Sequence, residues 1–130
     1  MTDVKQKVLI IEDNAVNAQL LTLFLEEAGF EVVRAHDGQT GLETIASHKG
    51  INVVLLDRIM PDMDGLQALK AIKLGQKSWN IPVIMLTAAL SSKQIEEAKL
   101  VGAFACLPKP YDKTKIVNTI NDALKQGRRN

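Results

Sequence analysis

Apolar and polar residues follow two alternating patterns along this chain. Continuous aliphatic runs are separated by stretches in which apolar side chains recur at helical spacing. Runs without period-two alternation are typical of strands covered on both faces. We expect strands at 7–11, 31–35, 51–56, 82–86 and 104–107, and the first of these runs has the pattern of a strand covered on both faces.

The stretches between these runs predict amphipathic helices. Leu21, Phe24, Leu25 and Ala28 lie at i, i+3, i+4 and i+7, which is one helical face, and Gly29 is placed to end that helix. Asp37, Ser91 or Ser92, and Asp112 stand where helix N-caps are expected. The later apolar stripes are Leu42, Ile45 and Ala46; Leu66, Leu69 and Ile72; Ile95 and Ala98; and Ile116, Ile120 and Leu124.

Five strand–helix units in succession define an α/β fold class. Such alternation implies a parallel sheet with right-handed crossovers and helices on both faces. Ligands of such folds bind beyond the carboxyl ends of the strands, where the strand order reverses. No linker interrupts the pattern, so we expect one domain over residues 1–130 with a core at about 7–125.

Composition excludes several classes of function. The net charge is +1 and the charges are mixed along the chain, whereas a nucleic-acid surface needs clustered Lys and Arg. The single cysteine cannot form an internal disulfide. No apolar run approaches the ~20 residues of a membrane span. We expect a cytoplasmic protein that binds neither nucleic acid nor membrane.

Polar residues stand where four of the predicted strands end. Glu12 and Asp13 follow the first run, Asp57 the third, Thr87 the fourth, and Lys109 comes just after the fifth. In a parallel sheet these positions share one edge, so carboxylates, a hydroxyl and an ammonium group should converge. Each residue alone has a common structural explanation: acidic residues cap helices and turns, Thr favours strands, and lysine is usually solvated.

The charges of this cluster indicate a metal. Carboxylates ~5 Å apart repel one another by about 3 kcal/mol at an effective dielectric constant near 20. Three carboxylates carry −3, which Mg²⁺ (or Mn²⁺) and Lys109 together balance. Pro108 and Pro110 flank that lysine and restrict its backbone, which suits a fixed contact with a phosphoryl oxygen.

The chain resembles the receiver domains of two-component response regulators. The matching elements are Glu12-Asp13-Asn14, Leu55-Leu56-Asp57, Met60 through Gly65, Thr87-Ala88 and Lys109-Pro110. The resemblance implies a flavodoxin-like sheet in the order 2-1-3-4-5. It also implies that Asp57 accepts a phosphoryl group from a histidine kinase or a histidine phosphotransfer protein.

The same resemblance assigns the other site residues. Glu12, Asp13, Asp57 and the carbonyl of Ile59 would hold Mg²⁺, and Lys109 and Thr87 would contact the phosphoryl oxygens. Ala88 is small enough to let the following loop close. A downstream protein would dock on the face made by the fourth helix, fifth strand and fifth helix.

Four positions depart from the family pattern. Cys106 replaces an aromatic residue, so we interpret it as a small core residue and expect coupling through the Thr87 loop and Tyr111. Arg58 follows the acceptor as a surface charge near the pocket mouth that could attract a phosphodonor. Ile59 and Ala89 cannot orient water, so we expect slow self-hydrolysis of the phosphorylated form.

Three further residues have structural interpretations. Trp79 should pack in its loop, and His36 and His48 should be surface residues.

Other functions remain open from the residues alone. A pseudo-receiver that only binds proteins would keep the fold without phosphorylation. A small phosphatase with an aspartate nucleophile is disfavoured, because a second Asp would be expected at position 59. A nucleotide site is disfavoured by the absence of a Gly-rich loop after the first strand. We expect no turnover of other substrates, and either a stand-alone receiver or one excised from a hybrid kinase.

Overall fold

The computed structural model describes residues 5–47, 50–88 and 91–127. Five strands form one parallel sheet in the order β2-β1-β3-β4-β5. Their bounds are β1 Lys7–Ile11, β2 Glu31–Ala35, β3 Ile51–Asp57, β4 Val83–Thr87 and β5 Ala105–Pro108. The helices that alternate with them in the described chain are α1 Ala15–Glu27, α2 Gly38–Ser47, α3 Gly65–Leu74, α4 Ser92–Val101 and α5 Lys113–Gly127.

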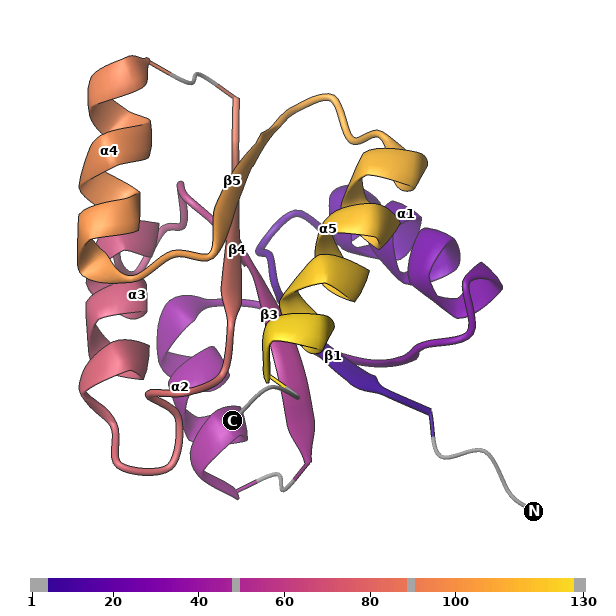
Figure 1. Ribbon diagram of the computed structural model, residues 1–130, viewed down its shortest axis with the longest axis horizontal. Coiled ribbons are helices and arrows are strands. Elements are labelled where there is room, and N and C mark those ends of the chain that lie inside the picture. The colour runs from indigo at the N-terminus through magenta and orange to yellow at the C-terminus, as the bar shows by residue number, and fades with distance from the viewer. Residues whose placement is uncertain (1–4, 48–49, 89–90, 128–130) are drawn as a thin grey trace.

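The sheet is the middle layer of three. Helices α1 and α5 cover one face, and α2, α3 and α4 cover the other (Figure 1). On the first side, Leu21 and Leu25 of α1 and Ile116 and Ile120 of α5 pack on one set of strand residues. On the second side, α3 supplies much of the packing, including Leu69. This confirms the predicted fold class and strand order.

Two of the polar residues predicted to follow strands, Asp57 and Thr87, belong to the strands themselves, whereas Glu12, Asp13 and Lys109 lie beyond the strand ends as predicted. Asp57 is the last residue of β3 and pairs with Leu86, and Thr87 is the last residue of β4 and pairs with Pro108. The third, fourth and fifth strands therefore end one residue later than predicted. Because neighbouring parallel strands are in register, this places both side chains at one edge of the sheet.

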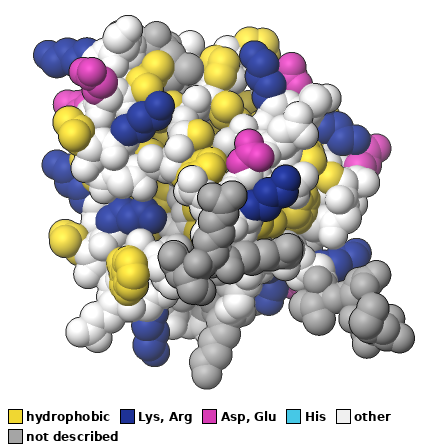
Figure 2. All heavy atoms as spheres, in the orientation of Figure 1, with side chains coloured by type: hydrophobic (Ala, Val, Ile, Leu, Met, Phe, Trp, Pro, Cys, Tyr) yellow, Lys and Arg dark blue, Asp and Glu magenta, His cyan; other side chains and the backbone are white. Residues whose placement is uncertain are grey.

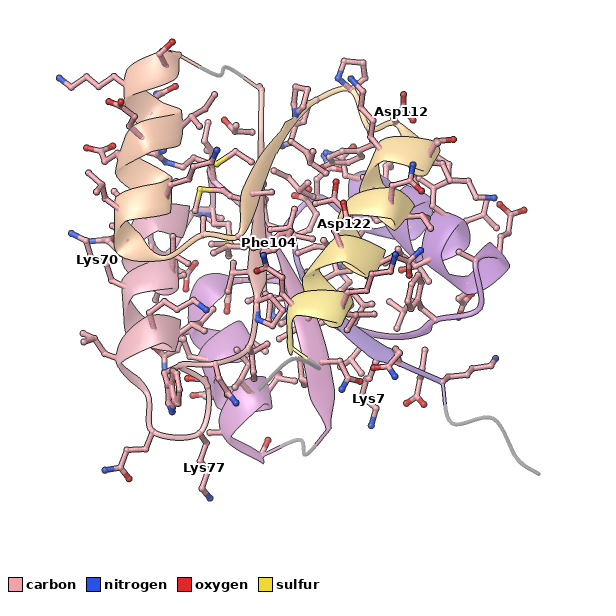
Figure 3. All side chains as sticks on the ribbon, in the orientation of Figure 1. Lys7, Lys70, Lys77, Phe104, Asp112 and Asp122 are labelled. Carbon is pink, nitrogen blue, oxygen red and sulfur yellow. The ribbon has the colours of Figure 1, made fainter. Side chains whose placement is uncertain are left out.

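Helix starts follow local capping chemistry. Ser91 caps α4 and accepts a bond from Gln94 N at 3.1 Å, which selects it over Ser92. Asp112 lies at the entry to α5 and accepts from Lys115 N at 3.1 Å (Figure 3). Asp37 accepts from Thr40 N at 2.7 Å. Gly29, where the chain leaves α1, has φ +95°, a backbone conformation that favours glycine.

Three packing predictions are wrong. Ala28 and Ala46 are exposed, because each falls in the last turn of its helix or just beyond it, where the chain has left the sheet. Trp79 is 61% exposed and does not pack into the loop before β4. The tight turn there is closed by the Ser78 hydroxyl on Ile72 O (2.6 Å), so the indole is not needed to fill it.

The surface is mixed in charge. Lys and Arg side chains are interspersed with Asp and Glu over the face in Figure 2 and do not gather into one patch. Within the described ranges, no helix combines the length and the apolar character that crossing a bilayer requires.

Candidate functional site

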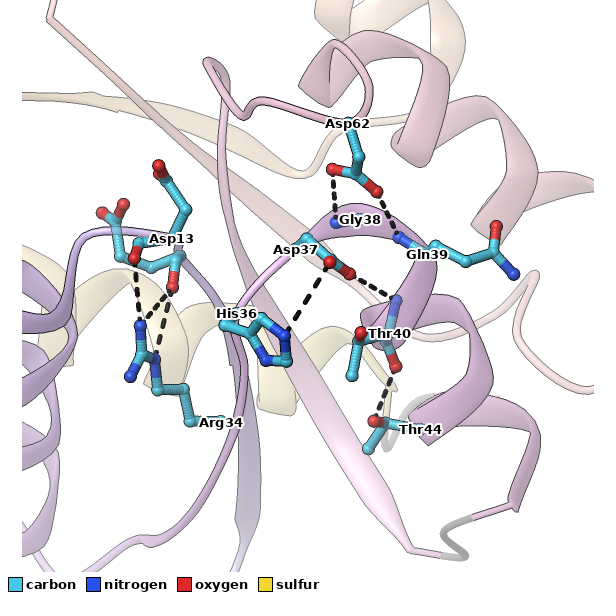
Figure 4. A network of polar contacts seen from close by, with 10 residues as sticks. Asp13, Arg34, His36, Asp37, Gly38, Gln39, Thr40, Thr44 and Asp62 are labelled. Atoms are coloured by element: carbon cyan, nitrogen blue, oxygen red, sulfur yellow. Dashed lines mark hydrogen bonds and ion pairs between the residues drawn. The ribbon is translucent and has the colours of Figure 1, made fainter.

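The loop that follows β1 delivers two acidic residues with opposite exposure. The Glu12 side chain is buried, whereas Asp13 is exposed. Arg34 of β2 fixes this loop by donating to Glu12 O at 3.0 Å and Asp13 O at 3.2 Å (Figure 4). Asn14 then caps α1 by accepting from Asn17 N at 2.9 Å. The acidic pair is thereby held between a strand end and a helix start.

The end of β3 delivers the third acid. Asp57 is 3% exposed and accepts a hydrogen bond from Lys109 Nζ at 2.9 Å on its Oδ1. The chain turns sharply after it, since Gly65 N donates to Arg58 O at 2.7 Å. A Cβ at Gly65 would lie 2.7 Å from both Arg58 Cα and Asp57 O. Only glycine lets α3 start this close to the end of β3.

These acids form one cluster suited to a cation. One carboxylate oxygen from each of Glu12, Asp13 and Asp57 lies within 4.8 Å of the others. Burial, reinforced by neighbouring Asp57, raises the pKa of Glu12 to about 7, although bonds from Tyr111 and Asn14 oppose the rise. A divalent cation would remove this cost, and carboxylate oxygens are its preferred ligands. The cluster could therefore hold a metal ion.

The segment after β5 brings the predicted lysine to the cluster. Lys109 N donates to Thr87 O at 2.9 Å, which ties this segment to the end of β4, and the Lys109–Pro110 peptide bond is cis. The Lys109 side chain is one-quarter exposed and reaches Asp57. Its Nζ also lies 5.9 Å from the centre of the Tyr111 ring. The convergence of the acids and the lysine is as predicted.

Thr87 and its neighbours border the site on the other side. Thr87 is 8% exposed, Ala88 is exposed, and Ala89 lies outside the described residues. An open hollow of about 420 Å³ is lined by Thr87, Ala88 and Ile59, among others. The Ile59 side chain is 71% exposed and does not close this hollow off from solvent.

The expectation of a free surface charge at Arg58 is wrong. Its side chain is only 17% exposed, with Nε 3.0 Å from Asp64 Oδ1 and Nη2 3.7 Å from Glu97 Oε1. Asp64 is also the N-cap of α3, and Glu97 belongs to α4. Arg58 therefore links the end of β3 to α3 and α4, and its charge is paired with two carboxylates of the protein.

Cys106 is half-buried in β5 and packs against the core beneath α3 and α4. Burial raises the pKa of its thiol, while the positive charges of Lys99 and Arg58 act in the opposite direction. A raised pKa leaves less reactive thiolate at neutral pH. This agrees with the interpretation of Cys106 as a core residue.

Two contacts were not predicted. The Tyr111 hydroxyl donates to Glu12 Oε1 at 2.7 Å, so a residue from the end of the fold reaches the first acid. Asp62, in the loop after β3, accepts from Gly38 N at 3.0 Å and Gln39 N at 2.8 Å and so caps α2 (Figure 4). Tyr111 could have been found from its place two residues after Lys109, whereas no local signal links Asp62 to α2.

The comparisons with known proteins place the chain in one family. Residues 8–121 match the family model of the response regulator receiver domain. The protein PilH of Pseudomonas aeruginosa is 32% identical over 118 residues, which is 91% of this chain and 97% of PilH. The transcriptional regulatory protein CpxR of Escherichia coli K12 is 35% identical over 120 residues, 92% of this chain and 50% of CpxR.

Solved structures agree with these relatives. The chemotaxis protein CheY4 of Vibrio cholerae superposes with a TM-score of 0.87 at 30% identity, covering 93% of this chain and 100% of CheY4. A receiver domain protein from Clostridium thermocellum gives 0.87 at 30% identity, covering 94% and 96%. The chain spans only about half the length of CpxR of Escherichia coli and of the CpxR homologue of Haemophilus influenzae.

This chain belongs to the response regulator receiver domain family. It is a signalling module with a phosphoacceptor role in two-component systems. Receiver domains in general take phosphoryl groups from histidine kinases and act on downstream partners.

Proposed function

We propose that Asp57 is the phosphoacceptor. The observation that carries this is its position: a buried carboxylate, paired with Lys109 at 2.9 Å, in the same cluster as Glu12 and Asp13. An Asp57 carboxylate oxygen would attack the phosphorus of a phosphohistidine. The P–N bond would break, the imidazole nitrogen would leave with the electron pair and take a proton from solvent, and an acyl phosphate would form.

Glu12, Asp13, Asp57 and the Ile59 carbonyl are the residues that would hold Mg²⁺ or Mn²⁺. When bound, the cation supplies positive charge beside the transferred group. Lys109 already lies against Asp57 and would follow the new phosphoryl oxygens as a second positive charge. Thr87, at the end of the neighbouring strand, would donate its hydroxyl to the same group.

The phosphoryl group would change how partners bind. Its charge would draw Thr87 and Lys109 inward, and Ala88 offers no bulk against closure of the loop that follows. The Thr87 loop leads into α4, and Arg58 joins α4 to the acceptor strand. We therefore infer that the output lies on the face formed by α4, β5 and α5.

The protein would act as a substrate of its phosphodonor and as a docking partner. The chain's own chemistry would be limited to its phosphorylation and its dephosphorylation. The donor would be a histidine kinase or a histidine phosphotransfer protein. Whether residues 1–130 act alone or within a longer protein, the receiver unit, with its core at about 7–125, would carry this step.

Intact-mass spectrometry tests the proposal. The protein is incubated with acetyl phosphate with and without Mg²⁺, beside an Asp57→Asn variant. One phosphoryl mass should appear only in the wild type with Mg²⁺. A wild type that gains no mass, while its melting temperature shows that it is folded, would indicate a module that only binds proteins. Hydrolysis of unrelated phosphomonoesters would indicate a phosphatase.

A further inference from the structure

The Tyr111 hydroxyl makes a contact that the proposed phosphotransfer does not use. It donates to Glu12 Oε1 at 2.7 Å across a sequence separation of 99 residues. Tyr111 is the only tyrosine in the chain, and its ring is half-buried against the core formed with α1 and α5. The bond therefore joins a rigid anchor to a carboxylate that is almost wholly shielded from water.

This hydrogen bond fixes the orientation of the Glu12 carboxylate group. Oε1 receives the Tyr111 hydroxyl, and Oε2 accepts from Asn14 N at 3.3 Å. The second contact is longer and comes from a main-chain group of the loop that carries Glu12 itself. Tyr111 is thus the short contact that holds this side chain from outside its own loop.

One short segment, residues 109–111, contacts both buried acids of the cluster. Lys109 reaches Asp57 at 2.9 Å, and Tyr111, two residues later, reaches Glu12 at 2.7 Å. The lysine Nζ lies 5.9 Å from the Tyr111 ring centre, so the two side chains are neighbours. Residues 109–111 therefore position both the ammonium group and one of the cluster's carboxylates.

We propose that Tyr111 is a positioning residue for the metal, which orients Glu12 through its hydroxyl and thereby sets the Mg²⁺ affinity of the site. Hydrogen bonds to carboxylate ligands commonly contribute tenfold or more to metal affinity. Loss of this hydroxyl should weaken Mg²⁺ binding by roughly tenfold, the low end of that range, because Asn14 N still contacts Glu12. This inference rests on the proposed function of the acidic cluster.

The test compares the wild type with Tyr111→Phe, which keeps the ring and removes only the hydroxyl. Thr119→Val is the matched control, since it removes an α5 hydroxyl that bonds only to Lys115 O among the described contacts. Mn²⁺ binding is followed by electron paramagnetic resonance, and Mg²⁺ affinity is obtained by competition. Melting temperatures verify that each variant is folded.

We expect Tyr111→Phe to raise the Mg²⁺ dissociation constant roughly tenfold and Thr119→Val to leave it unchanged. Phosphorylation of Tyr111→Phe by acetyl phosphate should need more Mg²⁺ but approach the wild-type rate at saturation. In the wild type, Mg²⁺ should also alter the near-ultraviolet spectrum of the single tyrosine, and Glu12→Gln should abolish that change.

An unchanged Mg²⁺ affinity in folded Tyr111→Phe, with a wild type that is phosphorylated normally, would overturn this inference alone. So would a tyrosine spectrum that stays constant while Mg²⁺ binds. A wild type that neither binds Mg²⁺ nor accepts a phosphoryl group would overturn the proposed function, and this inference with it.

Discussion

At the scale of single residues, the site is a balance between buried negative charge and a few fixed donors. Glu12 is 1% exposed and Asp57 is 3% exposed, so solvent screens neither of them. Lys109 faces Asp57, and Tyr111 faces Glu12. A cluster with more buried negative charge than positive charge is unfavourable for the free energy of folding. Adding a cation or a proton reduces this cost.

The pKa of Glu12 makes this cost measurable. Burial raises it from an ordinary value of 4.5 to about 7, so the folded protein holds the proton more tightly than the unfolded chain does. The resulting stabilisation is complete below pH 4.5 and is lost as the pH rises through about 7. In metal-free buffer, the wild type should lose about 3 kcal/mol over this window relative to Glu12→Gln, since one pKa unit corresponds to about 1.4 kcal/mol.

Urea unfolding at several pH values, with chelator present, measures this difference. Mg²⁺ should reduce the loss in the wild type, because the cation favours the ionised carboxylate. If the two proteins kept parallel stability curves from acid to neutral pH, Glu12 would not be the group that titrates.

The acids and the lysine could be predicted because each stands at the end of an apolar run. Strand register then brings them together without further information. Tyr111 and Asp62 could not be predicted in the same way, since their contacts depend on how loops from distant parts of the chain fold back. The engagement of Arg58 was missed for the same reason, because its partner Glu97 lies on α4, in the next strand–helix unit along the chain.

At the scale of elements, the loop beyond the carboxyl end of β3 connects that strand to the neighbouring helices. Arg58 connects β3 to the start of α3 through Asp64 and to α4 through Glu97. Asp62 connects the same loop to the start of α2. The loop that follows Asp57 therefore contacts all three helices on that side of the sheet.

Replacing Arg58 by Met should loosen α4. The variant keeps an aliphatic side chain of similar length but loses both carboxylate contacts. Amides of α4 (Ser92–Val101) should exchange with deuterium faster, by about fivefold for an exposed or half-exposed ion pair worth about 1 kcal/mol. Lys93→Met, on the exposed side of the same helix, is the control, and equal exchange in the two variants would refute the tether.

Removal of the Asp62 carboxylate should destabilise the fold by about 1 kcal/mol, since it leaves two N–H groups at the start of α2 without their acceptor. Chemical unfolding of Asp62→Ala, beside Asp122→Ala on the exposed side of α5, measures this. Asp122 should have almost no effect. Comparable losses in the two variants would show that the α2 cap contributes nothing specific.

Local patterns predicted the elements well where burial is two-sided. The three central strands, β1, β3 and β4, were found from continuous aliphatic runs, which are needed when helices cover both faces of the sheet. The edge strands β2 and β5 were also found, although they are only partly buried. Helix faces were predicted less well at their ends. Ala28 and Ala46 follow helical spacing but lie where α1 and α2 run past the sheet, and spacing alone does not report that.

At the scale of the whole molecule, one sheet separates two apolar layers. Leu9 faces the layer under α2, α3 and α4, and its neighbour Ile10 faces the layer under α1 and α5. Both residues are fully buried. Because adjacent residues of one strand pack in opposite layers, we expect the two layers to unfold together.

Leu9→Ala and Ile10→Ala should therefore behave alike. Each should lower the unfolding free energy by about 2–5 kcal/mol, the usual cost of a large-to-small change in a packed core. Each should also keep a single transition when unfolding is followed by far-ultraviolet and by near-ultraviolet circular dichroism. Two separated transitions in either variant would show that the layers fold independently.

The central claim is that this sheet edge turns Asp57 into a transient carrier of a phosphoryl group. The most direct measurement is chemical trapping: the protein is phosphorylated with Mg²⁺ and a phosphohistidine donor, reduced with borohydride, digested and sequenced by mass spectrometry. Borohydride converts an aspartyl phosphate to homoserine, so the account requires homoserine at position 57 of the wild type. Homoserine at another aspartate, or none in a folded protein that receives a competent donor, would contradict it.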